Sequence, residues 1–553
     1  MTDAPAPDVW RTSLAHNAHE RGTLPAITRK QPEGGFESLS HAALYEKALA
    51  YESVFRAHTE PGQVIPLLLA RTGECAAAMH GALLAGRAFC TLNPKLRIPQ
   101  LEYVLAQLRS PLALVDGQGL LALRGEIAAD SALMQTTWHV CGGSSLSRHA
   151  ERVTGELALR TRVVRHDREP LDGLPRLPDA AREVPAPPDD APGCCLFTSG
   201  STGTPKGVLI SRGDLRARAI VEQRWLALDT RDVVLNVLPF SFDVGLNQLF
   251  ATMHAGAELV VLESWLPADV LTTVAARSVT GIAAVPMIWG DFLAHGCTFD
   301  RKGAHASLRY ITVSGGDLSP TQHRRLPEIA PGARIFKTYG QTEAFRITSL
   351  RPEDYAERPL SVGRALPGGH VYVLREDLSP AGPGELGEVV HTGVGTMLGY
   401  LGDPRQADKL RRNPCQGPHD ANAVAVFTGD MGQLDSEGYL TLCGRRDELV
   451  KIAGNRVYPA EVKALVSELP ELAIVEVVPV PAERGTELVA FVVPRDGAHV
   501  DGAQLRRALS ARAPSYMVPA RIEPCRELPR TASGKPDRPV LQQRAAALLR
   551  GEN

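Results

Sequence analysis

Short apolar runs alternate with longer amphipathic stretches over about the first 180 positions of the chain. The stretch HAALYEKALAYESVFRAH (41–58) has helical spacing, whereas VIPLLLA (64–70) and LALVD (112–116) have the length and composition of buried strands. Strands that alternate with helices are typical of βαβ units. The pattern therefore predicts a layered α/β domain in this part of the chain.

The same alternation of strands and helices continues in the middle of the chain, and the pattern of hydrophobic residues changes toward the end. VVLNVLPF (233–240), AELVVLES (257–264), GIAAVP (281–286) and RYITVSGG (309–316) are apolar runs of strand length, as expected for a largely parallel, buried sheet. From about residue 370, short strands with glycine-rich turns predict a smaller β unit. Beyond residue 447, a compact α+β pattern of about 100 residues is long enough for a separate domain.

Net charge and cysteine content limit the kinds of molecule that the chain is expected to bind. The chain has 60 Lys and Arg against 62 Asp and Glu, a formal charge of −2, which gives no field that would attract nucleic acid or an anionic membrane. Nine scattered cysteines show no CxxC spacing, and no stretch has the roughly 18 apolar residues that would span a bilayer. We therefore expect a cytoplasmic protein that acts on small molecules, without nucleic acid or membrane.

The segment LFTSGSTGTPKGVLIS (196–211) places small hydroxyl residues and glycines between two apolar runs. Glycines allow close backbone approach, hydroxyls donate hydrogen bonds, and the lysine adds a point charge, a combination that suits phosphate oxygens. It is not a P-loop, because Lys206 follows proline rather than glycine. A flexible serine-rich turn is the alternative. The expected phosphate-binding residues are Thr198, Ser199, Gly200, Ser201, Thr202, Gly203 and Lys206.

This loop and four later motifs resemble those of the adenylate-forming enzymes, which include acyl-CoA synthetases, nonribosomal-peptide adenylation domains and firefly luciferase. The further motifs occur in the family's order, as YGQTEA (339–344), FTGD (427–430), GRRDELVKIAGNRVYPAEV (444–462) and LPRTASGKPDR (528–538). The resemblance implies an α/β fold in which a large N-terminal domain of layered α/β sheets with a small β subdomain precedes a small mobile α+β C-terminal domain. It places the large domain at 1–444, the hinge at 445–447 and the small domain at 448–553.

Several motif residues are expected to bind MgATP. A hydroxyl at Thr342 suits a phosphate oxygen and a carboxylate at Glu343 suits a bridging Mg²⁺, although the pair by itself would read as an ordinary solvated turn. The resemblance implies that Tyr339 stacks on adenine, with Gly315 and Gly316 against the base. Asp430 by itself would more often be a turn residue, but the resemblance implies that it lies at the ribose, where a carboxylate can accept from both hydroxyls and Arg445 could reach the same sugar.

Lys535 lies on a glycine-bearing turn near the end of the chain and would by itself read as a solvated lysine. The resemblance implies that it swings into the site and neutralises both the substrate carboxylate and the α-phosphate. The next nucleophile must then enter where the lysine was, so the small domain is expected to move away. Asp447 matches the hinge position, and Lys451 and Gly454 are expected to face the tunnel of the incoming thiol.

The acid-binding residues leave two interpretations open. In amino-acid-activating members of the resembling family, an aspartate at the position of Asp243 pairs with the substrate ammonium, and Arg346 would then bind a second acidic or polar group. Alternatively, Asp243 and Arg346 pair with each other and the substrate is a neutral acyl or hydroxy acid, because a buried arginine requires an anion. The other residues expected to line the pocket are Val244, Asn247, Ala283, Ser314 and Ile347.

The expected reaction is therefore the ATP-dependent adenylation of a small carboxylic acid, followed by transfer to a pantetheine thiol of CoA or of a separate carrier protein. We expect an amino or polar acid, with a non-amino acid as the alternative. The chain ends at Asn553, and GGSSL (142–146) lacks the surroundings of a carrier attachment site, so no fused carrier is expected. An amide-forming ligase and a nucleotide-binding regulator without turnover are the rival hypotheses.

Overall fold

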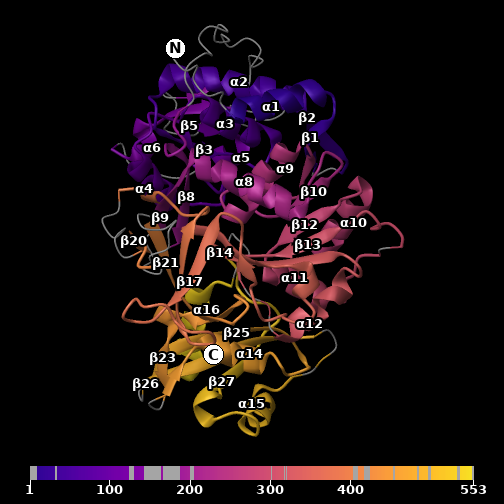
Figure 1. Ribbon diagram of the computed structural model, residues 1–553, viewed down its shortest axis with the longest axis vertical. Helices are drawn as coiled ribbons and strands as arrows, with labels where there is room; N and C mark the ends of the chain where they lie inside the picture. Colours follow the sequence, from indigo (N-terminus) through magenta and orange to yellow (C-terminus); the bar gives the residue numbers. More distant parts are fainter. Residues whose placement is uncertain are drawn as a thin grey trace. The chain divides into compact units, whose positions relative to one another are not determined.

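The computed structural model describes residues 9–31, 34–123, 127, 130–141, 163–165, 187–199, 205–300, 302–316, 318, 320–402, 409–415, 424–452, 455–482, 485–495, 498, 500–531 and 536–550. The chain divides into two units. Figure 1 labels many of their helices and strands and colours the chain along its sequence. Unit 1 comprises Met1–Glu263 and Val394–Asp408, and unit 2 comprises Ser264–Gly393 and Lys409–Asn553.

One sheet of unit 1 has a parallel centre and an antiparallel edge. β4, β3, β5 and β6 pair in parallel, whereas β8 and β9 form an antiparallel pair beside β4. Its strands, in spatial order, are β19 (Gly399–Tyr400), β9 (Pro205–Ser211), β8 (Pro192–Ser199), β4 (Ala88–Thr91), β3 (Val64–Leu68), β5 (Leu112–Val115), β6 (Thr137–Val140) and β7 (Val163–Arg165). The expected layered α/β domain is thus present.

Four further strands of unit 1 pair side by side, and helices cover both groups. In spatial order the strands are β10 (Val233–Asn236), β11 (Glu258–Val261), β1 (Pro25–Lys30) and β2 (Phe36–Ser40). The helices are α1 (Val9–Glu20), α2 (His41–His58), α3 (Gly73–Leu84), α4 (Ile98–Leu108), α5 (Gly117–Ala122), α6 (Ala132–Gln135), α8 (Arg212–Leu226) and α9 (Asp243–Ala255). The helix expected at 41–58 has these same bounds because Ser40 caps it, its Oγ accepting from Ala43 N at 3.2 Å.

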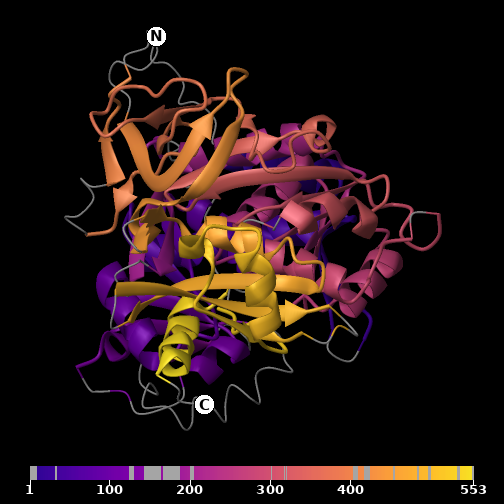
Figure 2. The same ribbon diagram turned by 90° about the horizontal axis from the view of Figure 1, so that it is seen from below.

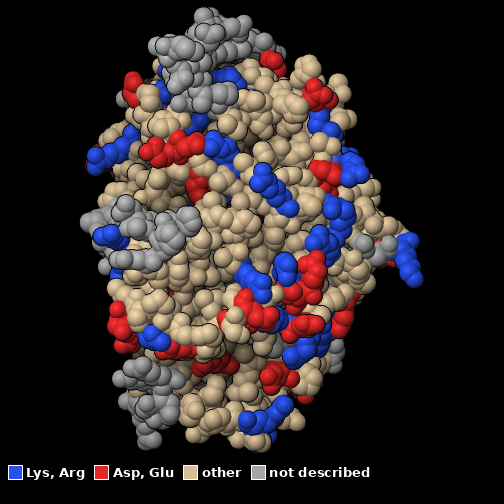
Figure 3. Space-filling view, in the orientation of Figure 1, with Lys and Arg blue, Asp and Glu red and all other residues tan. Residues whose placement is uncertain are grey.

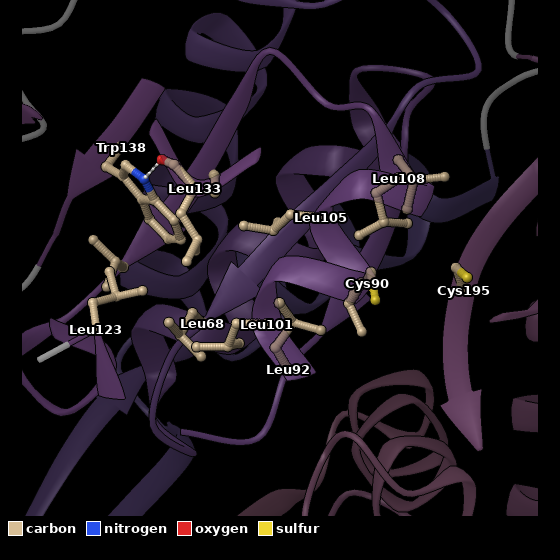
Figure 4. Close-up of a cluster of buried hydrophobic side chains, with 14 of the residues drawn as sticks. Leu68, Cys90, Leu92, Leu101, Leu105, Leu108, Leu123, Leu133, Trp138 and Cys195 are labelled. Atoms are coloured by element: carbon tan, nitrogen blue, oxygen red, sulfur yellow. Dashed lines mark hydrogen bonds between the residues drawn. The ribbon is translucent and has the colours of Figure 1, made fainter. Parts of the chain in front are cut away.

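A hydrophobic core lies between the parallel strands of unit 1 and α4 (Figure 4). Leu68 and Cys90 on the strands and Leu101 on α4 are all fully buried. The indole of Trp138 is also fully buried, and its Nε1 donates to the carbonyl oxygen of Leu133 at 2.9 Å. Burial of this apolar surface stabilises the sheet to which β8 and β9 belong.

The α/β part of unit 2 is built on three parallel strands, β12 (Gly281–Ala284), β13 (Tyr310–Val313) and β14 (Arg334–Gln341). Because these strands are parallel, their carboxyl ends meet at one edge, where ligands bind in open α/β sheets. The flanking elements are the antiparallel strands β15 (Ala344–Leu350) and β16 (Arg364–Ala365) and the helices α10 (Pro267–Arg277), α11 (Pro286–Ala294) and α12 (Pro320–Ile329).

The expected β subdomain is an antiparallel sheet within unit 2. Its strands are β17 (Gly369–Leu374), β18 (Gly387–Gly393), β21 (Val424–Leu434) and β20 (Leu410–Arg412), with β22 (Leu440–Arg445) paired to β21. A short 3-10 helix, η5 (Arg446–Glu448), follows β22 and overlaps the predicted hinge, 445–447, at Arg446 and Asp447.

The C-terminal part of unit 2 has its own α+β arrangement, drawn in gold and yellow in Figure 2. Its elements are β23 (Val450–Ile452), β24 (Asn455–Val457), α14 (Pro459–Val466), β25 (Leu472–Ala482), β26 (Gly485–Pro494), α15 (Gly502–Ser510), β27 (Arg521–Pro524) and α16 (Arg538–Leu549). Two hydrophobic clusters consist only of residues from 450 onward, so this part buries a core of its own. The large-domain, hinge and small-domain boundaries at 444 and 448 stay predictions.

The apolar length of the helices and the distribution of surface charge are the two features that concern binding to a membrane or to nucleic acid. Within the described ranges, no helix is long and apolar enough to cross a membrane. Figure 3 shows basic and acidic side chains interspersed over the face that it displays. That face therefore presents no extended patch of a single charge.

A histidine buried in unit 1 gives a first testable prediction about pH. His80 of α3 is 1% exposed, and its ring lies 6.4 Å from that of Trp10 and 5.2 Å from that of Phe250. Neither ring nitrogen has a hydrogen-bond partner among the described residues. Burial lowers the pKa of His80 from 6.5 to about 4. The unfolded chain takes up this proton near pH 6.5, so stability that is present above pH 6.5 is lost as the pH falls toward 4.

We expect His80→Leu to be about 2 kcal/mol more stable than the natural chain at pH 5 and close to it at pH 7. Hydrogen exchange of the α3 amides at the two pH values measures this difference locally. His16→Gln, at an exposed position of α1, is the matched control and should change neither value. An equal effect of His80→Leu on stability at both pH values would contradict the lowered pKa of the buried His80.

Candidate functional site

The YGQTEA motif forms the tip of a β-hairpin in unit 2. Thr342 and Glu343 are the two-residue connection between β14 and β15, where Gln341 pairs with Ala344. Two steps along β14, from Tyr339 to Gln341, correspond to four steps along β15, so β15 bulges at this point. The hairpin thus presents a hydroxyl and a carboxylate beyond the end of both strands.

The bulge explains the glycine of the motif. Arg346 lies in it with φ of 48°, a left-handed conformation that is uncommon for a residue with a side chain. A Cβ on Gly340 would lie 2.4 Å from the backbone nitrogen of Arg346, which no other residue could tolerate without a shift of the chain. Gly340 therefore permits the close approach that sets the position of Arg346.

A second bulge sets the position of Asp430. Glu388 and Val390 of β18 oppose Met431 and Phe427 of β21, so two steps on β18 face four on β21. Gly429 takes φ of 73° within this bulge. Thr428 Oγ1 donates to the carbonyl of Val389 at 2.6 Å and accepts from the backbone nitrogen of Asp430 at 3.0 Å. These bonds fix the bulge directly before Asp430, and a bulge re-aims the side chains beside it.

The carboxylate of Asp430 accepts hydrogen bonds from three side chains. Tyr339 Oη and Gln341 Nε2 each donate to Oδ2 at 2.6 Å, and Arg445 Nη1 lies 3.2 Å from Oδ1. Burial raises the pKa of the Tyr339 hydroxyl well above its usual range, and the neighbouring carboxylate adds to this effect. The structure thus brings together three of the predicted nucleotide-binding residues, Tyr339, Asp430 and Arg445, while their roles toward adenine and ribose stay predictions.

Two residues near Asp430 were not singled out from the sequence. Gln341 lies within the YGQTEA motif, between the predicted residues Tyr339 and Thr342, and this position is the sequence signal that could have identified it. Lys409 Nζ donates to the carbonyl oxygen of Thr428 and lies 3.5 Å from Gln341 Oε1. Burial lowers the pKa of Lys409, and the charge of Glu343 opposes that shift. Lys409 follows no recognisable pattern in the sequence, so only the fold reveals it.

Arg445 links Asp430 to the predicted hinge residue. Its Nε lies 3.1 Å from Asp447 Oδ1, while Nη1 contacts Asp430. Burial alone would lower the pKa of the Arg445 guanidinium, but the carboxylates of Asp430, Asp447 and Glu448 outweigh it and raise that pKa. Hence one guanidinium contacts both the predicted ribose residue and the predicted hinge.

The predicted acid-binding residues of unit 2 are buried. Ser314 follows the carboxyl end of β13, and its Oγ lies 2.5 Å from Thr338 Oγ1. Arg346 Nη1 donates to the same Thr338 oxygen at 3.3 Å, and its guanidinium lies 5.2 Å from the ring centroid of Phe345.

The other predicted residues of unit 2 lie on or next to the same sheet. Ala283 on β12 and Ile347 on β15 are 1% and 0% exposed. Gly315 and Gly316, which are expected at the adenine, follow Ser314 and have positive φ. A pocket lined by these residues stays a prediction.

The predicted phosphate loop belongs to unit 1. β8 and β9 pair antiparallel up to Ser199 and Pro205, with Thr198 opposite Lys206, so the loop connects two paired strands as expected. Lys206 Nζ lies 5.1 Å from the ring centroid of Tyr400 on β19. The loop residues Gly200, Ser201, Thr202 and Gly203 lie outside the described residues.

The other predicted residues of unit 1 lie on α9. Asp243 is the first residue of this helix, is 8% exposed, and accepts from the backbone nitrogen of Val244 at 2.7 Å. An acidic residue in the first turn is stabilised by the helix dipole. The side-chain nitrogen of Asn247 donates to Glu222 of α8. Asp243 and Arg346 belong to different units, so whether they pair or bind the substrate stays a prediction.

Three predictions concern the C-terminal part. Lys535 and Gly454 lie outside the described residues. For Lys451, the structure describes a place in β23, where it pairs with Arg456, but not the side chain. The assignments of the catalytic lysine and of the thiol tunnel therefore stay predictions.

Comparison with known proteins identifies the family. The sequence profile of the AMP-binding enzyme family matches residues 14–401, and that of the AMP-binding enzyme C-terminal domain matches residues 461–535. A sulfoacetate–CoA ligase from Cupriavidus necator is 30% identical over 506 residues, which cover 88% of this chain and 88% of that protein. A dimodular nonribosomal peptide synthase from Bacillus subtilis is 28% identical over 524 residues, or 91% of this chain but 20% of that protein.

Other relatives differ in how much of their length the chain spans. An indoleacetate–CoA ligase from Aromatoleum aromaticum is 31% identical over 383 residues, which cover 68% of this chain and 70% of that protein. The chain spans 6% of the length of CymA, a relative from Salinispora arenicola. Among solved structures, an anthranilate CoA ligase in complex with anthranoyl-AMP superposes with a TM-score of 0.80, covering 98% of each chain at 21% identity.

At that identity the structural likeness shows the fold alone, an α/β architecture with a large N-terminal and a small C-terminal domain, as the motifs predicted. The family assignment rests on the sequence profiles, which together reach from residue 14 to the motif around Lys535. The chain belongs to the AMP-binding enzyme family, within the adenylate-forming superfamily that its motifs resemble.

Proposed function

We propose that this chain activates a small carboxylic acid with MgATP, releases pyrophosphate, and transfers the acyl group from acyl-AMP to a pantetheine thiol. The observation that carries the proposal is the Asp430 carboxylate, held by Tyr339, Gln341 and Arg445 beside the hairpin of the YGQTEA motif. A carboxylate that accepts from several donors is well suited to exchange some of them for the two hydroxyls of a ribose. Membership of the AMP-binding enzyme family supports this use.

The residues of the nucleotide half have distinct roles in the proposal. Asp430 accepts from the ribose hydroxyls while Arg445 holds its other oxygen, and the ring of Tyr339 lies against adenine. Lys206 and the hydroxyl-rich loop neutralise the phosphates. The single carboxylate of Glu343 fits Mg²⁺, since this ion is usually held by one or two carboxylates together with substrate phosphates. When bound, the ion offsets charge on the departing pyrophosphate.

The first step joins two anions, so charge neutralisation is the main task of the protein. An oxygen of the substrate carboxylate attacks the α-phosphorus, the bond from that phosphorus to the bridging oxygen breaks, and pyrophosphate leaves. Lys535 is assigned to both reacting anions, where a fixed positive charge lowers the barrier. In the second step a thiolate attacks the acyl carbon, and AMP leaves with the oxygen that came from the acid.

The substrate class is proposed from the buried polar residues. Ser314, Thr338 and Arg346 form a chain of polar contacts at 2.5 and 3.3 Å, and a buried guanidinium favours an acid with a second polar or anionic group. A small polar acid fits this chain, and an amino acid fits if Asp243 binds its ammonium. The sulfoacetate–CoA ligase relative supports an acid with a second anion and CoA as acceptor. The peptide synthase relative supports an amino acid and a carrier protein.

A panel of acids tests the proposed function. The protein is incubated with MgATP and amino, hydroxy, sulfonated and aryl acids in turn, and pyrophosphate release and acyl-AMP are measured by mass spectrometry. One acid or a narrow group should give both products. CoA, a phosphopantetheinylated carrier and amines are then supplied in parallel, and amide formation with amines alone would favour the rival amide ligase. No acyl-AMP from any acid would refute the proposal.

A further inference from the structure

A partly buried lysine of unit 2 lies close to the carboxylate that is assigned to the ribose. Lys409 directly precedes β20, which pairs with β21, and its Nζ donates to the carbonyl oxygen of Thr428. A Cβ on Gly429 would lie 3.6 Å from Lys409 Nζ and 3.5 Å from Arg445 Nη2. The glycine therefore leaves room for two cations beside the chain directly before Asp430.

The side-chain amide of Gln341 lies between Lys409 and Asp430. Its Nε2 donates to the carbonyl oxygen of Thr428 at 3.0 Å and to Asp430 Oδ2 at 2.6 Å. Its Oε1 lies 3.5 Å from Lys409 Nζ. An amide has one donor end and one acceptor end, so a reversed amide would turn its NH₂ group toward the ammonium and its oxygen toward the carboxylate. The cation therefore favours the orientation in which Gln341 donates to Asp430.

The charges around Lys409 come from four neighbouring elements. Burial lowers the pKa of Lys409, and the charge of Arg445 on β22 adds to this shift. Three carboxylates oppose it, those of Glu343 in the β14–β15 hairpin, Asp430 on β21 and Glu388 on β18. These carboxylates favour the charged ammonium, whose hydrogen bonds are stronger than those of a neutral donor.

We propose that Lys409 is a positioning residue for nucleotide binding, which acts through the amide of Gln341 on the carboxylate of Asp430. The inference rests on the proposed function, because it takes Asp430 as the acceptor of the ribose hydroxyls. Lys409 fixes the orientation of the amide, and the amide nitrogen fixes Asp430 Oδ2. A carboxylate that is held in place before the nucleotide arrives loses less side-chain freedom on binding. Lys409 itself is assigned to neither the ribose nor the phosphates.

Binding of AMP, measured by isothermal titration calorimetry, tests the proposal without an acid or a thiol. Lys409→Met removes the ammonium at similar side-chain length and should weaken AMP binding about 10-fold, an effect of the size expected for a hydrogen bond to a charged group. Gln341→Ala should weaken it by a similar factor. Because both residues act along one path, the double variant should bind about as weakly as the weaker single variant, whereas independent effects would multiply to about 100-fold.

The loss of affinity should concern the ribose. The natural chain should bind AMP more tightly than 2′-deoxy-AMP, and Lys409→Met should reduce this preference, which a general loss of stability would not do. Arg412→Met removes a cation from an exposed position of β20 and is the matched control, expected to change neither the affinity nor the preference. Lys409→Gln also removes the charge, should give the same pattern as Lys409→Met, and replaces it if that variant does not fold.

Multiplying effects in the double variant, an unchanged preference in Lys409→Met, or an equal loss in Arg412→Met would each overturn the proposal. Asp430→Ala distinguishes its failure from that of the proposed function. If Asp430→Ala weakens AMP binding and Lys409→Met does not, the positioning role is wrong and the proposed function stands. If Asp430→Ala leaves AMP binding unchanged, the ribose assignment fails and the role of Lys409 fails with it. Melting temperatures of all variants separate these outcomes from misfolding.

Discussion

Replacing Lys535 by alanine is expected to lower the rate of acyl-AMP formation about 10²–10³-fold or more, while thioester formation from supplied acyl-AMP persists. The physical reason is that the carboxylate and the α-phosphate repel each other, and a positioned ammonium group stabilises both as they approach. The second step joins a thiolate to an acyl-AMP that is already formed, so it does not need the same charge. Single-turnover assays of the two half-reactions measure the separation.

The control for this experiment is Lys302→Ala, which removes an exposed lysine from a connection between α11 and β13 and should change neither step. If Lys535→Ala reduced both half-reactions equally, the residue would not act in one orientation of the C-terminal part alone. If it reduced neither, the assignment of the catalytic lysine would be wrong, although the family assignment would stand.

Replacing Asp430 by alanine is expected to lower kcat/KM for ATP about 10²-fold or more. A hydrogen bond to a charged group contributes about 1.5–3 kcal/mol, and the carboxylate is assigned to two ribose hydroxyls. The substitution also leaves Tyr339, Gln341 and Arg445 without their shared acceptor. Asp430→Asn keeps the shape and one acceptor oxygen, so its loss should be smaller than that of the alanine variant.

Two comparisons make the Asp430 prediction specific. With 2′-deoxy-ATP the natural chain should lose part of its kcat/KM, whereas Asp430→Ala should discriminate little between the two nucleotides, because the group that contacts the hydroxyl is gone. Asp377→Asn, at an exposed position of the β subdomain, should leave both values unchanged. If Asp430→Ala still distinguished ATP from 2′-deoxy-ATP as strongly as the natural chain, Asp430 would not be the residue that binds the ribose.

The periodic pattern of the sequence predicted the elements well where strands are buried and helices amphipathic. The helix at 41–58 and the strands at 64–68, 112–115 and 281–284 are present because each buries a continuous apolar face. The family resemblance predicted that Tyr339, Asp430 and Arg445 share a function, and the structure brings their side chains together.

The parts that sequence reasoning missed depend on contacts distant in the chain. The bulges at Arg346 and Asp430 arise from register shifts between paired strands, and no local pattern encodes such a shift. Lys409 approaches Gln341 only because β20 pairs with β21. The ion pair between Arg530 and Asp291 joins positions 239 residues apart. Each of these features is a property of the folded sheet rather than of the sequence around it.

The central claim is that a carboxyl oxygen of the acid attacks the α-phosphorus of ATP. It is tested most directly with an acid, identified from the panel, whose two carboxyl oxygens are both ¹⁸O. After complete turnover with MgATP and the thiol acceptor, mass spectrometry should find one ¹⁸O in each AMP and none in pyrophosphate. Unlabelled AMP, or label in inorganic phosphate together with ADP, would contradict the account.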